Sequence, residues 1–136
     1  MNIGSIAWPV DRRASINLYL GFLIKVIETL DVKFPSVGPE PLSAAKMYMI
    51  GQLPENEYRA FASIWWRYID GEGEIRNFKN EDFLKARIAI CLLSVTLDDV
   101  EILGEHLSWF FEVLELLGIN LDIPINMMID YFEFHE

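Results

Sequence analysis

The sequence predicts an all-α fold, a single-domain bundle of about six helices over residues 1–136. Three observations predict it. Apolar residues recur at i, i+3, i+4 and i+7 along most of the chain, whereas no stretch shows convincing β-strand alternation. Proline and glycine residues separate these apolar segments. The chain has 136 residues and is 52% hydrophobic, which is enough to bury a substantial core.

The first two predicted helices flank a long loop. Residues 11–32 are apolar on nearly all helical faces, a pattern typical of a central helix in a bundle. Residues 33–43 hold three prolines and a glycine and are expected to form the loop. A short helix over 42–50 follows, and Gly51 closes it.

The third and fourth predicted helices differ in how their apolar residues are placed. Pro54 suits the first helical position of a helix that continues to residue 69 and carries a broad aromatic face. After the polar stretch "DGEGEIRNF", Asn80 is expected to cap a largely apolar helix over 81–95.

The last two predicted helices lie in a region without bases. Thr96 is expected to cap a helix over 97–117, and Gly118 suits the position just after its end. Asp122 begins a final helix over 122–134.

The charge distribution is uneven. Residues 1–87 carry eleven acidic and eleven basic side chains, whereas residues 88–136 carry ten acidic ones and no Lys or Arg, so the net charge of −10 arises in the last third. An acidic chain lacks the basic footprint that direct nucleic-acid binding needs, and it is not expected to bind anionic membranes.

The sequence also predicts a cytoplasmic location. The most apolar stretch, residues 16–30, is interrupted by Lys25 and Glu28 and is too short to cross a bilayer. No secretory signal is visible at the start of the sequence. The single cysteine, Cys91, permits no internal disulfide and is expected to pack in the core, in agreement with a reducing compartment.

The 97–117 helix is predicted to carry an acidic stripe. At about 100° per residue, its polar residues fall on one face about 100° wide. The final helix repeats the pattern more weakly, with Asn126 outward and Ile125, Met128, Ile129 and Phe132 inward. The candidate partner-binding residues are Asp98, Glu101, Glu105, Ser108, Trp109, Glu112, Glu115, Asp130 and Glu133.

Two interpretations of the stripe are open. It is either a solvated face that keeps the protein soluble or a docking surface for a cationic protein. A solvated helix usually interleaves Lys with Glu, because like charges at i,i+4 cost roughly 0.2–0.5 kcal/mol per pair. Glu101 and Glu105 carry that cost, which favours docking. Trp109, on the flank of the stripe, is either a core residue or an exposed anchor.

No motif predicts catalysis, a metal or a cofactor. Asp70, Glu72, Glu74 and Glu81 occupy calcium-loop positions, but the required glycine is replaced by Ile75, so an acidic surface turn is favoured. The chain has no Glu-x-x-His pair, and two histidines with one cysteine are too few for a zinc site. His106 is expected to be an ordinary, partly packed histidine. The sequence therefore predicts a protein that is not an enzyme.

A small, acidic, all-helical chain of this kind resembles the helical immunity proteins of bacterial contact-dependent growth inhibition and related toxin systems. The resemblance covers the character of the whole chain, with the stripe over 98–115 and the absence of bases after Arg87 as the features that fit. It implies a bacterial inhibitor that stays in the cytosol, binds a cationic toxin domain such as a nuclease and blocks it.

Two alternatives are open. A nucleic-acid mimic that inhibits a DNA-binding protein would use the same stripe and would differ only in its partner. A helical enzyme or metal-binding bundle would need carboxylates that converge inward. Exposure of Glu101, Glu105 and Glu112 away from any pocket would argue against that second alternative.

Overall fold

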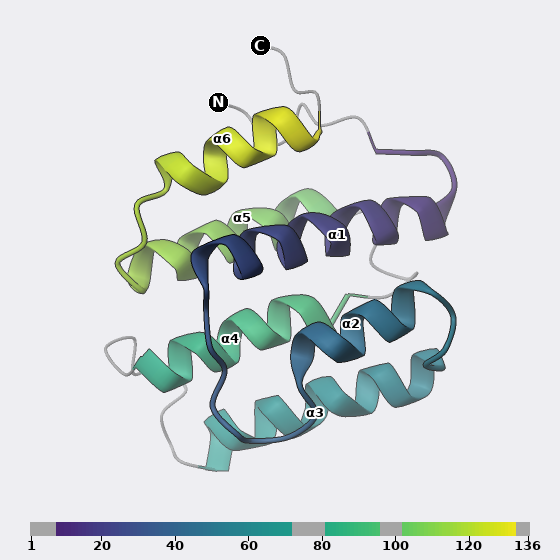
Figure 1. The fold of residues 1–136 in the computed structure, drawn as a ribbon. Coiled ribbons are helices and arrows are strands. Elements are labelled where there is room, and N and C mark those ends of the chain that lie inside the picture. The colour runs from purple at the N-terminus through teal and green to yellow at the C-terminus, as the bar shows by residue number, and fades with distance from the viewer. Residues whose placement is uncertain (1–7, 72–80, 96–101, 133–136) are drawn as a thin grey trace.

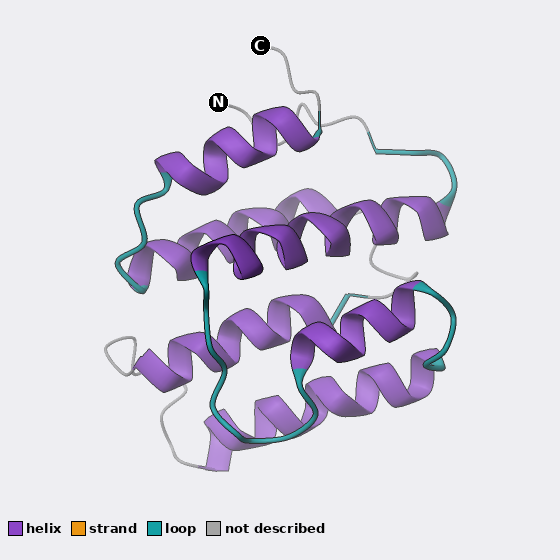
Figure 2. Cartoon of the chain, viewed as in Figure 1, coloured by secondary structure: helices purple, strands orange, loops and turns teal. Residues whose placement is uncertain are grey.

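The computed structural model describes residues 8–71, 81–95 and 102–132. Within these ranges it contains helices and no strand (Figures 1 and 2). The helices are α1 (Arg12–Leu30), α2 (Pro41–Met49), α3 (Glu55–Gly71), α4 (Glu81–Leu93), α5 (Leu103–Leu116) and α6 (Asp122–Tyr131). The prediction of an all-α bundle of about six helices is confirmed.

The helices form a stack in which neighbours in space are not always neighbours in sequence. Helix α6 packs on α1, α1 packs on α2, and α5 packs on α4 (Figure 1). Helices α2, α3 and α4 contact one another at the end of the stack opposite α6. Helix α6 is therefore the outer helix at one end, and α5 contacts both α4 and, through aromatic side chains, α1.

Helix α4 lies at the centre of the bundle, where it contacts α2, α3 and α5. Every residue from 88 to 93 has an exposed fraction of 0%, so this helix has no solvated face over nearly two turns. The burial predicted for residues 11–32 is also confirmed, because α1 contributes buried residues on most of its faces.

Two buried tyrosines from other helices donate hydrogen bonds to backbone carbonyls at the end of α4. The last carbonyls of a helix have no partner within the helix. The Tyr19 hydroxyl, from α1, donates to the Cys91 carbonyl at 3.2 Å, and the Tyr58 hydroxyl, from α3, donates to the Leu92 carbonyl at 2.5 Å. These bonds fix α1 and α3 against the same turn of α4.

An aromatic stack extends from this point toward the surface. The rings of Tyr58 and Tyr48 lie 4.1 Å apart with an interplanar angle of 8°. The Arg13 guanidinium lies 4.5 Å from the centroid of the Tyr48 ring and donates to the Tyr48 carbonyl at the end of α2. The Tyr48 hydroxyl donates to the Glu55 carboxylate at 3.0 Å. Side chains from the ends of α1, α2 and α3 thus contact one another.

Glycines end two of the helices as predicted. Gly51, after α2, has a φ of 78°, and Gly118, after α5, has a φ of 84°. Both donate backbone hydrogen bonds to the preceding turn, to the carbonyls of Tyr48 and Glu115. A side chain would be strained at this φ, which explains why glycine suits both positions.

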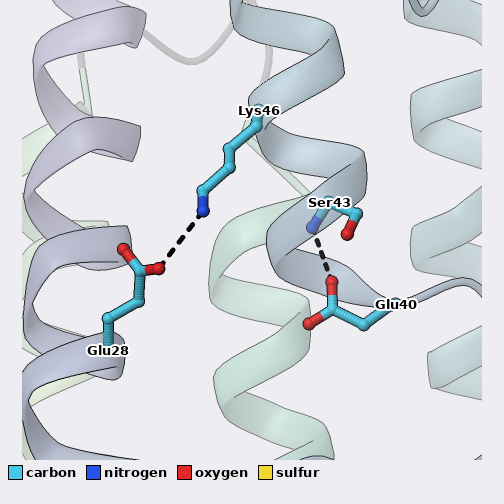
Figure 3. A network of polar contacts seen from close by, with 4 residues as sticks. All are labelled: Glu28, Glu40, Ser43 and Lys46. Atoms are coloured by element: carbon cyan, nitrogen blue, oxygen red, sulfur yellow. Dashed lines mark hydrogen bonds and ion pairs between the residues drawn. The ribbon is translucent and has the colours of Figure 1, made fainter.

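Other helix boundaries differ slightly from the prediction. Helix α2 begins at Pro41 because the Glu40 carboxylate accepts a hydrogen bond from the Ser43 amide at 2.5 Å (Figure 3). Helix α3 begins one residue after Pro54, and α4 ends at Leu93 rather than at residue 95. The predicted caps Asn80 and Thr96 lie outside the described residues.

Asp31 ends α1 in a conformation better suited to glycine. Its φ is 54°, and it is the non-glycine residue with positive φ among those described. Its carboxylate also lies at the negative end of the helix dipole. We expect Asp31→Gly to raise the free energy of unfolding by about 1 kcal/mol, as measured by urea denaturation. The exposed ion pair from Asp31 to Lys33 offsets little of this gain. Asp31→Ala, which keeps the strain, should not be stabilised to the same extent.

Candidate functional site

The outer face of α5 is the candidate site. The residues that α5 buries lie on one side of the helix: Leu103, Leu107, Phe110, Phe111, Val113 and Leu114. Glu105, Glu112, Glu115 and Leu116 are exposed on the other side. By helical geometry Glu105 and Glu112 differ in direction by only about 20°, so they form one row along the helix.

The structure supports part of the predicted stripe. Glu105, Glu112 and Glu115 are exposed on one face, and Ser108 lies between them, partly buried. Helix α5 begins at Leu103, with Ile102 at its N-cap, and residues 97–101 of the predicted helix lie outside the described residues. The φ of −118° and ψ of 21° place Ile102 outside the α-helical region.

Three candidate residues stay predictions. Asp98 and Glu101 precede α5, and Glu133 follows α6; all three lie outside the described residues. The described part of the stripe therefore spans residues 105–115.

Trp109 has a burial between those of the two positions considered for it. Its side chain packs against the core on one side and is accessible to solvent on the other. It lies about 40° around α5 from Glu105, and Leu116 lies about 40° from Glu112 in the same direction. Leu116 is 49% exposed. Sequence reasoning did not include Leu116 in the site, although its spacing of four from Glu112 was a usable signal.

The carboxylates on α5 have no cationic neighbours in the described ranges. Glu105, Glu112 and Glu115 form no ion pair with any described residue, and α5 and α6 contain no Lys or Arg. Other helices pair their acids: Lys46 of α2 binds Glu28 of α1 at 3.2 Å (Figure 3). The face of α5 is thus electrostatically different from the surface formed by the first helices.

The acidic character is strongest near the end of α5. Glu112, Glu115 and Leu116 line an open depression with a volume of about 290 Å³. Glu115 lies in the last turn of α5, which contains no base. The helix dipole places partial negative charge at this end, so a carboxylate there is unfavourable for the isolated fold and attractive to a cation.

Helix α6 presents a second, mixed face. Asp130 is exposed as predicted, together with Asn126. Ile129, predicted to point inward, is 36% exposed, and Ile123 is 46% exposed. The prediction for Ile129 is wrong because α6 packs chiefly on α1 and fully buries only one narrow side.

A base from α1 borders this second face. The Lys25 ammonium lies 5.9 Å from the centroid of the Tyr131 ring, at the end of α6. A base of the same chain thus contacts the residue that follows Asp130, whereas no base among the described residues pairs with the carboxylates of α5. The outer face of α5 is accordingly the stronger candidate.

His106 lies on the flank of α5 rather than on the acidic face. It is partly buried, and its ring lies 6.5 Å from that of Tyr19 in an edge-on arrangement. Its Nε2 atom is buried without a hydrogen-bond partner among the described residues. This position agrees with the expected packed histidine.

The described residues hold no constellation suited to metal or covalent chemistry. No three His, Cys, Asp or Glu side chains among them gather closely enough to hold a metal ion. Residues 72–80 of the calcium-loop pattern lie outside the described residues. Cys91 is fully buried, and burial raises the pKa of its thiol, so the thiol is protonated at neutral pH and unreactive.

The search for a membrane span and the comparisons with known proteins are both negative. In the described part of the chain, no helix has the length and hydropathy needed to cross a membrane. No family model, no curated protein and no solved structure matches the sequence or the fold. The surface of α5 is therefore the feature that bears on function.

Proposed function

We propose that this protein is a non-catalytic inhibitor of the immunity class, which binds a cationic toxin domain through the outer face of α5 and neutralises it in the bacterial cytoplasm. The target that fits best is a nuclease. The observation that carries this proposal is the set of exposed carboxylates of Glu105, Glu112 and Glu115, which form no ion pair with any base among the described residues.

The proposed mechanism is electrostatic capture followed by local packing. A nuclease cleft attracts phosphate and is therefore positive, so a row of carboxylates competes for the same field. Opposite potentials can raise association rates by about 10–1,000-fold, and the effect weakens as salt increases. Trp109 and Leu116, on the flank of the row, supply apolar contact that slows dissociation.

The alternatives differ in what they would need from α5. A catalytic carboxylate pair needs a pocket that separates the pKa values of its two members. Glu105 and Glu112 are exposed instead, and the depression near Glu112 is open. A nucleic-acid mimic would use the same face and is distinguished by its partner.

We expect the double reversal Glu105→Lys and Glu112→Lys to lower the association rate with the native partner at least tenfold at low salt. Both side chains are exposed, so the fold should be retained, which circular dichroism checks. The partner is obtained by affinity capture from the native host at two salt concentrations, and association is then measured by stopped flow. The matched control is Glu57→Lys with Asp70→Lys, two exposed acids on α3.

The captured partner decides between the candidate functions. A basic nuclease that the wild-type protein inhibits, and the reversed variant does not, supports the immunity proposal. A non-nuclease DNA-binding protein captured in the same way favours the mimic. If the reversal and its α3 control associate equally fast at low salt, the outer face of α5 is a solvated surface and the proposal is wrong.

A further inference from the structure

The outer face of α5 carries two parallel rows of unlike chemistry. Glu105 and Glu112 form the acidic row, and Trp109 and Leu116 form the apolar row. The members of each row are seven residues apart, which is two helical turns or about 10.5 Å. Each apolar residue follows an acidic one by four positions, so the rows lie about 40° apart around the helix.

Both rows are accessible to a partner. Leu116 is 49% exposed, and Trp109 is partly buried against the core, which holds its ring in place. Glu112 and Leu116 also line one depression at the end of α5. An apolar side chain and a cation from one partner could therefore contact neighbouring positions of this face together.

A spacing of seven is the repeat by which helices pack side by side. In such packing, apolar residues repeat along the seam and charged residues flank it, with opposite charges facing one another. The two rows reproduce half of that arrangement on the surface of a folded protein. A strand or an irregular loop would not keep both rows in contact over two turns, because its side chains do not repeat with this period.

We infer that the partner docks on α5 through a basic amphipathic helix that lies along it. Its leucine-like residues, seven apart, contact Trp109 and Leu116, and its Lys or Arg residues, also seven apart, contact Glu105 and Glu112. This inference rests on the proposed function and specifies the element that the partner contributes. Pairing of α5 with α5 of a second copy does not fit, because α5 carries no base to face these carboxylates.

The experiment uses two synthetic peptides of three heptads each. In the first, Leu and Lys each repeat every seven residues and lie on adjacent rows. The second has the same composition and net charge in a scrambled order without that repeat. Affinity for the intact protein is measured by calorimetry, and the helicity of the bound peptide by circular dichroism.

The first peptide should bind at least tenfold more tightly than the second and should gain helicity on binding. Leu116→Ser should lower the affinity of the protein for the first peptide severalfold and leave its affinity for the second unchanged. The matched control is Ile50→Ser at the C-cap of α2, where the side chain is 68% exposed, and it should change neither affinity.

The remaining outcomes overturn the inference and are distinguishable from failure of the proposed function. Equal affinity of the two peptides, with both weakened by the reversal of Glu105 and Glu112, would show attraction to charge without helix recognition. It would leave the proposed function intact. Binding of neither peptide would overturn the helical partner, and the capture from the native host would still test the proposed function separately.

Discussion

Replacing Phe22 with alanine should lower the free energy of unfolding by about 3–5 kcal/mol. The side chain is fully buried at the junction of three helices. Its ring centroid lies 6.3 Å from that of Phe111 in α5, and 5.5 and 5.1 Å from those of Tyr131 and Phe132 at the end of α6. Alanine would leave a cavity there and remove these ring contacts. Urea denaturation measures the loss.

The same substitution should loosen α6 more than any other helix. Among its residues, α6 fully buries only Pro124 and Met128. Its end lies close to α1 at Gly21, where an added Cβ atom would lie 2.5 Å from the Tyr131 hydroxyl. The ring cluster around Phe22 thus supplies much of what holds α6 in place.

Hydrogen exchange separates this local effect from a general loss of stability. Amide protons of α6 should exchange faster in Phe22→Ala at conditions where those of α3 are unchanged. The matched control is Phe61→Ala, a partly buried ring on α3, which should not affect α6. Unchanged protection of α6 in Phe22→Ala would show that other contacts hold this helix.

The sequence was sufficient to predict the fold class because residues that a helix buries recur in the sequence at helical spacing. The predicted apolar face of α3 has six residues, of which four are buried (Tyr58, Ala62, Trp65 and Ile69) and two, Phe61 and Trp66, are partly buried. The loop after α1 was predicted from its prolines, and it covers α3 where the Trp65 indole donates to the Pro39 carbonyl at 3.3 Å.

Features that depend on neighbouring helices could not be predicted. The spacing of Asp98, Glu101 and Glu105 predicted a helix through Ile102, whereas Ile102 is the N-cap of α5 and residues 97–101 lie outside the described residues. The side of α6 that faces α1 depends on packing, so Ile129 was assigned to the wrong side. The left-handed conformation of Asp31 could not be predicted, because glycine, the usual signal for it, is absent at that position.

The candidate site was predictable in charge but not in shape. The absence of bases after Arg87 predicted the acidic surface, and the exposure of Glu105, Glu112 and Glu115 agrees with it. The apolar row beside them required the structure, because the pattern alone did not say how far Trp109 and Leu116 are exposed. The structure thus adds an apolar row beside the acidic row on the outer face of α5.

Raising the pH from 9 to 11 should lower the free energy of unfolding by about 3 kcal/mol through two buried groups. Burial raises the pKa of the Cys91 thiol and of the Tyr58 hydroxyl well above their ordinary values of 9.0 and 10.0. The unfolded chain therefore releases both protons in this range, whereas the folded chain keeps them. Because the folded state binds more protons, stability is fully present below the ordinary pKa values and falls as the pH rises.

Tyr48 adds a loss of the same sign between about pH 10 and 12. Burial, followed by the hydrogen bond to Glu55 and its charge, raises the pKa of Tyr48 to about 12. The unfolded chain loses this proton near pH 10, so the contribution begins to fall there and is lost as the pH rises through the folded pKa. The stacked pair of Tyr48 and Tyr58 thus adds to the alkaline destabilisation that Cys91 of α4 causes.

Urea denaturation at pH 9, 10 and 11 measures the slope, and tyrosinate absorbance reports when the rings ionise. Cys91→Ala should remove about 2 kcal/mol of the pH-dependent loss, and Tyr58→Phe about 1 kcal/mol, even though each variant is less stable than the wild-type protein at pH 8. Because the comparison is between slopes, the cost of each substitution cancels. A wild-type slope retained in both variants would show that the loss arises from ion pairs of lysine instead, such as that of Lys46 with Glu28.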